Sequence, residues 1–463
     1  MWTVDSVTHK AVLAVDANKY EVSPLDPDPD PSQLTNAGNR LFFTVDDGFN
    51  GERVWFSDST EAGTQRVENA ELVSNWGAPH ALTKAGDYIY FLATSAAQIP
   101  GLWRTDGTDT GTALVMEGEF TELTAANGTL FFVGDNRTLQ SGLWKIEPAT
   151  QTPVLLHETG TNQFALPEWI PTSLTPFNGF LYFQAGTEAF GSELWRSDGT
   201  SAGTIMVADQ APGPEHFGPD NLTVVGATLY FTANVQRNGM NFPALWRTDG
   251  TATGMQLLKV FDDLSGGSTR GGEPSELTAV GNLLYFALDP NGPPPEVWRS
   301  DGTPGGTIKL ATISPPDTFL PYEFTDVNGL AYFVGAAQNL DRGIWRSDGT
   351  PQGTQQILIF PFQGAEQLLT AVGNSLFFRL RQDATGTELW MLNEQIGCLR
   401  IVTDIYPGPN SAEPLHLTLV GENLYFVAED GKTGGELYVL ERASQLDCNF
   451  PYSQYLPFAM RNQ

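Results

Sequence analysis

The side chains that could carry out acid–base chemistry in this 463-residue chain are five histidines and 54 acidic residues. The histidines are His9, His80, His157, His216 and His416. They are scattered, and none belongs to an HExxH zinc motif. Two carboxylates can hydrolyse a glycosidic bond, but any of the 54 acids could supply them. The sequence therefore predicts no catalytic residue.

A second group with chemical potential is the Trp and the Asp of a repeated stretch. ELWRSDGTSAGT at residues 193–204 returns as EVWRSDGTPGGT at 296–307 and as GIWRSDGTPQGT at 343–354. A Trp can stack on a sugar, and an Asp can bind a cation. However, Ca²⁺ takes about six to eight oxygen ligands, and each of these turns supplies a single carboxylate. We therefore expect the Asp to cap its own turn.

No metal or cofactor site is predicted elsewhere. The loops DDGFNGE (46–52) and EDGKTGGE (429–436) lack the alternating acidic ligands of an EF-hand. DPDPDP (26–31) has the composition of an extended, Pro-rich spacer. Such an acidic chain would attract cations, Ca²⁺ among them, so Ca²⁺ is the one cofactor that the sequence leaves possible.

The repeated stretch belongs to a longer unit that occurs nine times. In each unit a Leu or Phe is followed nine residues later by a Phe. The pairs are Leu34 and Phe43, Leu82 and Phe91, Leu123 and Phe132, Leu174 and Phe183, Leu222 and Phe231, Leu277 and Phe286, Phe324 and Phe333, Leu369 and Phe378, and Leu417 and Phe426. Another aromatic follows that Phe after twelve residues in eight units, and after fifteen in one. These aromatics are Trp55, Trp103, Trp144, Trp195, Trp246 (the exception), Trp298, Trp345, Trp390 and Tyr438. Because burying a Trp removes roughly 200 Å² from water, we expect them to form core.

Each unit predicts four short strands. In the sixth, LTAVG and NLLYFAL meet at a Gly-Asn turn that favours a hairpin, EVWRS is a third strand, and TIKLAT is a fourth. Consecutive apolar residues, such as Leu229-Tyr230-Phe231, indicate strands covered on both faces. Such units are typical of the four-stranded antiparallel blades of a β-propeller. We predict an all-β propeller with nine blades, or eight if the third unit (GLWKIEPATQT), which lacks DGT, lies outside the ring.

The two ends of the chain predict how this ring closes. AVLAVD (Ala11–Asp16) resembles the fourth strand TIMVAD (204–209), while the last unit has a third strand, ELYVL (436–440), and no clear fourth. We therefore divide the chain into residues 1–33 (closing strand and Pro/Asp-rich spacer), 34–440 (propeller) and 441–463 (a tail that packs on the ring or leaves it).

The repeated stretch resembles the ELWxxDGT repeat of bacterial, mostly extracellular proteins. The resemblance covers nearly the whole chain, about residues 34–440, and departs from the pattern in units three, eight and nine, which lack DGT, and in unit one, which reads SDST. It implies a secreted or surface-displayed tandem-repeat protein with no activity established for the family as such.

Composition excludes several function classes. With 54 acidic residues against 24 Lys and Arg, the net charge of −30 repels nucleic acids and anionic membranes. No apolar run is long enough for a membrane span, and MWTVDSVTHKAVLAVD lacks the features of a signal peptide, so the export route is not visible. Cys398 and Cys448 occupy similar positions in neighbouring units, which predicts a disulfide and an oxidising compartment, extracellular or at the cell surface.

A ligand is expected on the face where the links between blades vary most. That face would carry aromatics and histidines, with acids such as Glu168, Asp262 and Asp263 nearby. The candidate ligand-binding residues are Trp76, His80, Trp169, His216, Phe217, Phe319 and Tyr322. The function that follows is a non-enzymatic adhesion or binding scaffold for a glycan or protein partner. A carboxylate-based glycosidase or lyase, and a structural surface-layer or adhesin component, monomeric or self-associating, are the alternatives.

Overall fold

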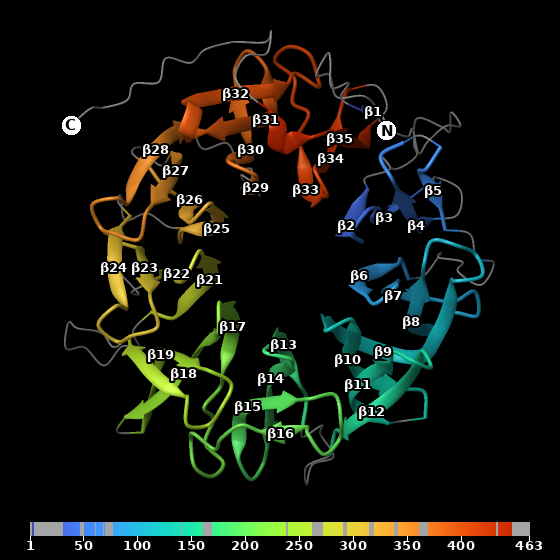
Figure 1. Ribbon diagram of the computed structural model, residues 1–463, viewed down its shortest axis with the longest axis vertical. Coiled ribbons are helices and arrows are strands. Elements are labelled where there is room, and N and C mark those ends of the chain that lie inside the picture. Colours follow the sequence, from blue (N-terminus) through green and yellow to red (C-terminus); the bar gives the residue numbers. More distant parts are fainter. Residues whose placement is uncertain are drawn as a thin grey trace.

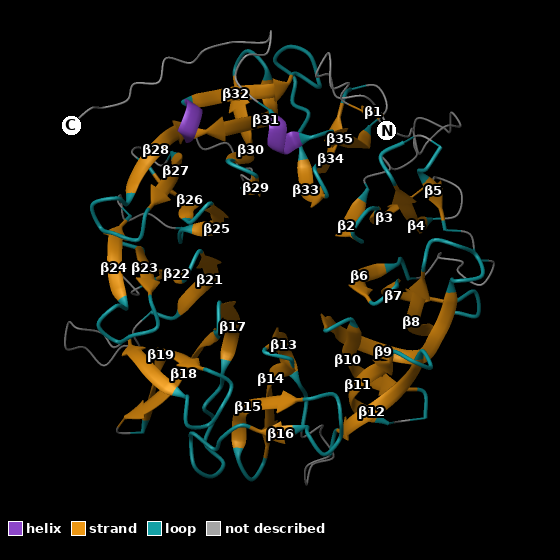
Figure 2. Cartoon of the chain, viewed as in Figure 1, coloured by secondary structure: helices purple, strands orange, loops and turns teal. Residues whose placement is uncertain are grey.

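The structure is a computed structural model of the chain. It describes residues 2–3, 31–46, 51–60, 62–67, 69, 77–138, 140–160, 169–237, 239–261, 272–289, 294–313, 319–337, 341–360, 369–431 and 434–446. Within this part, apart from two short 3₁₀ turns, η2 (Glu394–Ile396) and η3 (Ala443–Gln445), all regular elements are strands. Figure 2 shows mainly strands and loops, with short purple helical turns beside them. None of the helices in the described part has the length and apolar character needed to cross a membrane.

The strands form mainly four-stranded sheets, which follow one another around a central opening (Figure 1). The first six such sheets are β2 (Ser32–Asn36), β3 (Leu41–Asp46), β4 (Glu52–Ser57) and β5 (Gln65–Arg66); β13 (Thr172–Phe177), β14 (Phe180–Thr187), β15 (Gly191–Ser197) and β16 (Ile205–Met206); β17 (Asp220–Val225), β18 (Thr228–Arg237), β19 (Met240–Thr248) and β20 (Gln256–Val260); β21 (Pro274–Val280), β22 (Leu283–Leu288), β23 (Glu296–Ser300) and β24 (Ile308–Thr312); β25 (Tyr322–Val327), β26 (Leu330–Ala336), β27 (Arg342–Ser347) and β28 (Gln355–Phe360); and β29 (Thr370–Val372), β30 (Ser375–Gln382), β31 (Gly386–Asn393) and β32 (Cys398–Thr403). The seventh contains β33 (Leu415–Val420), β34 (Asn423–Glu429), β35 (Gly435–Leu440) and β1 (Trp2–Thr3). The prediction of an all-β fold built from four-stranded antiparallel sheets is confirmed.

Units two and three share one strand. The eighth sheet has seven strands: β6 (His80–Ala85), β7 (Tyr88–Thr94), β8 (Pro100–Thr105), β9 (Ala113–Ala126), β10 (Thr129–Asn136), β11 (Ser141–Glu147) and β12 (Thr152–Glu158). The first part of β9 pairs with β8 up to Glu117, and its second part pairs with β10 from Gly118 onward. One continuous strand is thus the fourth strand of unit two and the first strand of unit three.

The repeated aromatic pair fixes the register of the middle two strands. In every unit the Phe of the second strand lies directly opposite the aromatic of the third. In the sixth and ninth units these rings stack, Phe286 on Trp298 and Phe426 on Tyr438, with centroids 6.2 and 5.7 Å apart. The spacing of fifteen before Trp246 arises because the β18–β19 hairpin is longer, and Phe231 still faces Trp246.

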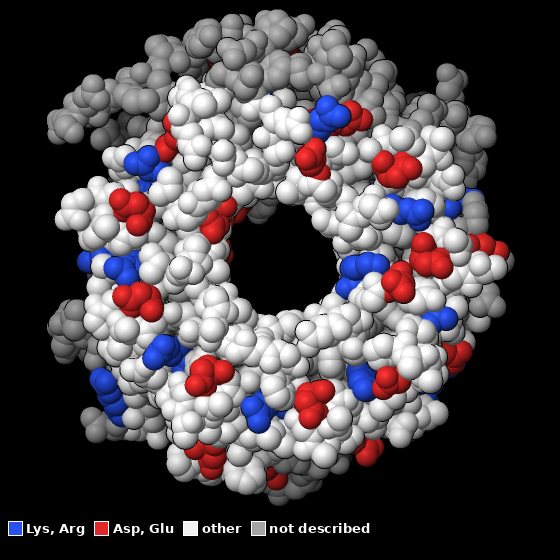
Figure 3. Space-filling model, viewed as in Figure 1, with Lys and Arg blue, Asp and Glu red and all other residues white. Residues whose placement is uncertain are grey.

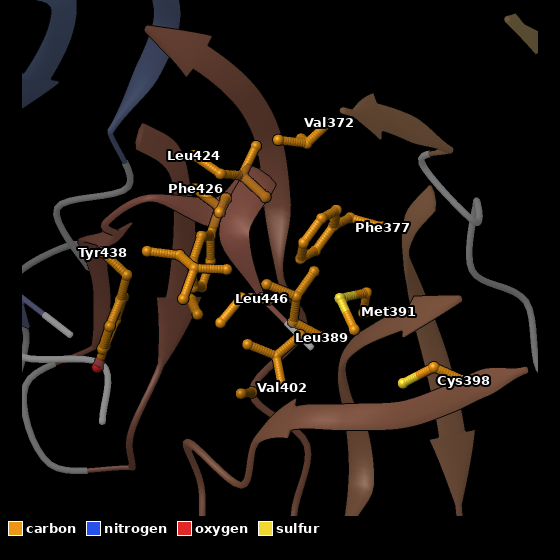
Figure 4. Packing of buried hydrophobic residues seen from close by; sticks show 14 residues of the cluster. Val372, Phe377, Leu389, Met391, Cys398, Val402, Leu424, Phe426, Tyr438 and Leu446 are labelled. Atoms are coloured by element: carbon orange, nitrogen blue, oxygen red, sulfur yellow. The ribbon is translucent and has the colours of Figure 1, made fainter. Parts of the chain in front are cut away.

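The apolar core lies between neighbouring sheets. Figure 4 shows one such layer, in which Phe377, Leu389 and Met391 meet Leu424 and Phe426 of the next sheet. The repeated aromatics contribute to these layers to different degrees. Trp103, Trp144, Trp390 and Tyr438 are buried, and Trp55, Trp195, Trp246, Trp298 and Trp345 are partly buried. Burial of large rings on both faces of each sheet explains the unbroken apolar runs of the sequence.

The SDGT segment is a turn held by its own side chains. Asp198 Oδ1 accepts the N–H and the hydroxyl of Thr200 at 2.8 and 2.7 Å, and the Thr200 hydroxyl accepts the N–H of Gly203 at 3.0 Å. The hydrogen bond from the Thr200 hydroxyl lowers the pKa of Asp198 below its usual value. The same bonds recur at Asp58, Asp106, Asp249, Asp301 and Asp348. The Asp of each of these turns therefore serves the turn itself.

The N-terminal strand differs from the expected one. Ala11–Asp16 lies outside the described residues, and so does most of the spacer (1–33) and of the tail (441–463). The strand that pairs with β35 is β1, with Trp2 opposite Tyr438, and it runs parallel to β35, whereas a fourth blade strand is antiparallel to the third. The first and last sheets also meet directly, because Asn36 Nδ2 donates to the Leu419 carbonyl at 2.7 Å.

Candidate functional site

The wall of the central opening is the most regular surface of the molecule. Figure 1 places the first strand of each sheet at the opening, and the space-filling view in Figure 3 shows the opening itself, with acidic and basic side chains interspersed around it. We call these first strands the wall strands: β2, β6, the part of β9 from Gly118, β13, β17, β21, β25, β29 and β33. The second part of β9 is included because β9 contacts both β6 and β13.

The wall strands carry a backbone feature that is rare for ordinary residues. Eight of them have a bulge in their pairing with the second strand, and within each bulge a residue other than Gly has a φ of 53° to 59°. These residues are Gln33, Ala81, Glu122, Ser173, Asn221, Glu276, Glu323 and His416. In the eighth unit of the repeat, which contains β29, the corresponding position lies outside the described residues. Strained positions of this kind concentrate at functional sites.

A short motif explains the bulge, and the sequence analysis missed it. Seven wall strands begin P-x-x-L/F-T, from PSQLT at residue 31 to PLHLT at 414, and all seven prolines are buried. In each, the Thr hydroxyl donates to the carbonyl of the residue at positive φ, at 2.8 to 3.1 Å. This local bond offsets part of the strain. The signal was present as a Pro three residues before the repeated Leu or Phe in seven of the nine units.

Side chains at the bulges connect neighbouring wall strands. Gln33 Oε1 accepts the N–H of Ala81 at 3.1 Å, and Glu276 Oε2 accepts the N–H of Glu323 at 3.3 Å. Glu323 Oε2 accepts the N–H of Leu369 at 3.0 Å. A fourth bridge runs from Glu122 to the N–H of Leu174 at 3.4 Å. A side-chain oxygen of one wall strand therefore accepts a backbone amide hydrogen of the next, and Ala81, Leu174 and Glu323 supply that amide from within a bulge.

A cavity of about 340 Å³ opens in the wall between β33 and β2. Three residues of each strand line it: Gln33, Leu34, Thr35, His416, Leu417 and Thr418. His416 and Gln33 are the residues at positive φ, and both are exposed. The cavity therefore coincides with two of the strained positions and with the junction of the first and last sheets.

Two aromatics expected on a ligand-binding face belong to the core instead. Trp169 is 2% exposed and stacks on His157 with ring centroids 3.9 Å apart. Phe217, also 2% exposed, packs edge-on against Trp246 at 5.0 Å. These side chains fold back between the sheets because the links that carry them would otherwise leave large apolar rings in water.

The other candidates on that face do not converge on one site. Phe319 and Tyr322 pack edge-on at 6.1 Å with the Arg342 guanidinium over both rings. His80 is exposed and lies 3.0 Å from the Ala78 carbonyl, and His216 is exposed and accepts the N–H of Ser192 at 3.1 Å. Trp76, Glu168, Asp262 and Asp263 lie outside the described residues.

Two buried glutamates of the ELW motif anchor links between sheets. Glu193 is fully buried and accepts the N–H groups of Gln210 and Ala211, each at 3.1 Å. Glu388 is fully buried and accepts those of Ile405 at 3.0 Å and Tyr406 at 3.3 Å. Burial raises the pKa of Glu193 to about 7 and that of Glu388 to about 8. Their carboxyl groups are thus committed to the backbone of these links.

Within the described ranges, no group of three or more His, Cys, Asp or Glu side chains is arranged to hold a metal ion. Cys398 is buried and disulfide-bonded. The other cysteine of the chain, Cys448, lies outside the described residues.

Comparisons with known proteins give similarity at the level of the fold. No family model matches the sequence, and no curated protein matches it. Among solved structures, it is similar to oligopeptidase B from Leishmania major (13% identity, TM-score 0.45, covering 79% of this chain and 53% of that one). It is also similar to puromycin hydrolase (16%, 0.40, 77% and 59%) and to the β-propeller domain of the Trilobed protease from Pyrococcus furiosus (12%, 0.38, 71% and 98%).

These neighbours correct the expected function. They are a peptidase, a hydrolase and a protease domain, which contradicts the expectation of a non-enzymatic scaffold that binds a glycan or protein through the variable-loop face. This chain spans between one half and three-fifths of the length of the first two.

Proposed function

We propose that the chain is the propeller module of a peptidase and that its central opening admits extended peptides. The observation that carries this proposal is the wall of the opening. Each of the eight separate wall strands ends its sheet, so one edge of the strand has no partner strand. An unpaired edge is a template for another extended chain, which is how many domains bind peptides.

The bulges suit passage rather than permanent pairing. At each bulge the ladder is interrupted and one residue is held at positive φ, so an extended peptide meets separate N–H and C=O groups and not a continuous edge. Bulges are also a known way to prevent irreversible strand addition. A wall of this kind gives weak, repeated contacts that do not depend on the peptide's sequence.

We assign admission of the peptide, and not its cleavage, to this wall. Acidic side chains on the wall could act as general bases only if their oxygens were available to a substrate. Glu122, Glu276 and Glu323 instead accept amide hydrogens of the next wall strand. The groups that cleave the peptide bond would therefore be supplied from outside the wall.

The nine-unit count and the closure of the ring are part of the same proposal. The contact between Asn36 and Leu419 and the pairing of β1 with β35 support a ring in which the last sheet meets the first. The disulfide of Cys398 supports an extracellular or cell-surface location, since disulfides persist in oxidising compartments. Both points, and membership in the ELWxxDGT repeat proteins, remain proposals.

Photo-cross-linking tests the proposed function. A linear peptide of about 15 residues, which reaches about 50 Å when extended, would carry a benzophenone group at its centre. We expect mass spectrometry to find the cross-links on the wall strands, and a disulfide-knotted mini-protein of similar mass, with the same photophore, to give none there. Cross-links that fall mainly on outer strands such as β24 and β28, or equal labelling of the wall by the compact control, would refute the proposal.

A further inference from the structure

We propose that the cavity between β33 and β2 binds a carboxylate carried by the peptide in the opening. This inference rests on the proposed function and deepens it. It starts from what occupies the same place at other junctions of wall strands. At four of them, a Glu or Gln oxygen accepts an amide hydrogen of the next wall strand: Gln33 to Ala81, Glu122 to Leu174, Glu276 to Glu323 and Glu323 to Leu369.

A second bond ties wall strands together at several junctions. The motif Thr hydroxyl shares its hydrogen between its own strand and the carbonyl of the repeated Leu in the next wall strand, which it reaches from Thr35 to Leu82 at 3.3 Å, from Thr223 to Leu277 at 3.3 Å and from Thr325 to Leu369 at 3.2 Å. Together, the acceptor oxygen and the Thr hydroxyl fill the space between two bulges.

The junction of β33 with β2 has neither bond among the described residues. His416 stands where the Glu stands in other wall strands. The Thr418 hydroxyl makes the bond to the carbonyl of its own strand that every motif Thr makes, and it has no second bond to β2 among the described residues. The first and last sheets are joined farther along instead, by Asn36 and Leu419. The space that the bridging side chains fill elsewhere is here the cavity of about 340 Å³.

At this junction backbone N–H donors line the cavity, but no described side chain of β33 supplies the oxygen that accepts them at other junctions. The register between β2 and β3 jumps from Ser32 to Thr35, so the bulge takes the N–H groups of Gln33 and Leu34 out of regular pairing. An imidazole has an N–H donor in every protonation state, and the exposed His416 places one at the rim. An anionic oxygen is the acceptor that such donors hold best, and a carboxylate is the group that fills this place at Glu122, Glu276 and Glu323.

The size of the cavity and the charge of the chain narrow the ligand class. Small-molecule pockets begin at about 300 Å³, which suits one or two terminal residues of a peptide. The net charge of −30 opposes anions at long range, but at physiological ionic strength this field is screened beyond about 8 Å. The carboxylate could come from the C-terminus of a peptide or from an Asp or Glu side chain, and the experiment separates the two.

Peptide binding by fluorescence anisotropy tests the inference. The probes are one N-terminally labelled linear peptide with a free C-terminus, the same peptide as its C-terminal amide, and the amide with a Glu at its penultimate position. We expect the free acid to bind at least about tenfold more tightly than the plain amide, as for a lost charge-assisted hydrogen bond. If only the Glu-containing amide binds more tightly than the plain amide, the site binds side-chain carboxylates and not the C-terminus.

The variant His416→Glu gives the matched control. Glu occupies the equivalent position at positive φ in three wall strands, so the backbone accepts it, and its carboxylate would take up the donors of the cavity. We expect H416E to lose the preference for the acid while binding the amide as before, with an unchanged melting temperature. The variant Glu276→Gln, which keeps its acceptor oxygen at another junction, should retain the preference.

The outcomes separate this inference from the proposed function. Equal binding of acid and amide, or a preference that survives H416E, would overturn the carboxylate site and leave the peptide-admitting wall in place. If neither acid nor amide cross-links to the wall strands, the proposed function and the inference fall together.

Discussion

The buried Glu388 makes the stability of the protein depend on pH in an unusual direction. Its pKa rises from 4.5 to about 8 because the carboxyl group is fully buried, and the nearby Asp404 charge raises it further. Between these two pH values the folded state holds a proton that the unfolded state has lost. The free energy of unfolding contributed by this group therefore falls as the pH rises from about 4.5 to about 8 and is constant outside that window.

The magnitude follows from the size of the shift. One pKa unit corresponds to about 1.4 kcal/mol, so the rise from 4.5 to about 8 corresponds to about 5 kcal/mol at and above pH 8. The variant Glu388→Gln cannot ionise and removes this dependence. It also replaces one of the two oxygens that accept the N–H groups of Ile405 and Tyr406, at a cost of about 1–3 kcal/mol. We thus expect E388Q to be less stable than wild type near pH 5 and more stable above pH 8.

Urea denaturation followed by tryptophan fluorescence measures this crossover. Unfolding midpoints of wild type and E388Q would be compared at several pH values between about 4.5 and 8.5. Hydrogen exchange at the amides of Ile405 and Tyr406 measures how strongly the Glu388 carboxyl group protects these two N–H groups. The control is Glu119→Gln, an exposed glutamate, which should track wild type at every pH. Parallel pH profiles for wild type and E388Q would refute the reasoning.

The remaining predictions concern the repeated turn and the disulfide. In Gly203→Ala the added methyl would meet the Asp198 carboxylate at 2.0 Å, so we expect a loss of about 1–3 kcal/mol in thermal melts, whereas Gly305→Ala, with nothing within 4 Å of the new methyl, should be neutral. Equal melting temperatures for the two variants would contradict this account of the turn. Removing the disulfide by Cys398→Ser should cost about 3–4 kcal/mol under oxidising conditions, and little difference should remain once wild type is reduced. A disulfide mapped by mass spectrometry to anything other than Cys398 and Cys448 of one chain would refute the pairing.

Much of the sheet architecture could be predicted because it is encoded in short-range spacing. A twelve-residue interval between Phe and Trp sets which residues face each other in a hairpin, and hairpin register is a local property. The SDGT turn is similarly local, since its bonds join residues only two or three positions apart. The continuity of β9 could not be predicted in this way. The sequence around Gly118 carries no turn-forming pattern that sets it apart from the segments that link other units.

The wall of the opening could not be predicted by the same means. Hydrophobic periodicity says which residues are buried, whereas the wall is defined by backbone angles at exposed residues such as Glu276 and His416. The aromatics of the links show the opposite error. Trp169 and Phe217 lie in segments of variable length, which suggests recognition, but whether such a ring turns outward or packs between sheets depends on the tertiary structure.

The shared strand β9 has a consequence for how this molecule can change. The other units lie in separate sheets, so a unit could in principle be gained or lost by recombination between its last strand and the first strand of the next unit. Units two and three cannot be separated in that way, because any cut within Ala113–Ala126 breaks hydrogen-bonded pairing with β8 or β10. We expect this pair to be inherited, and to unfold, as one double-sized block.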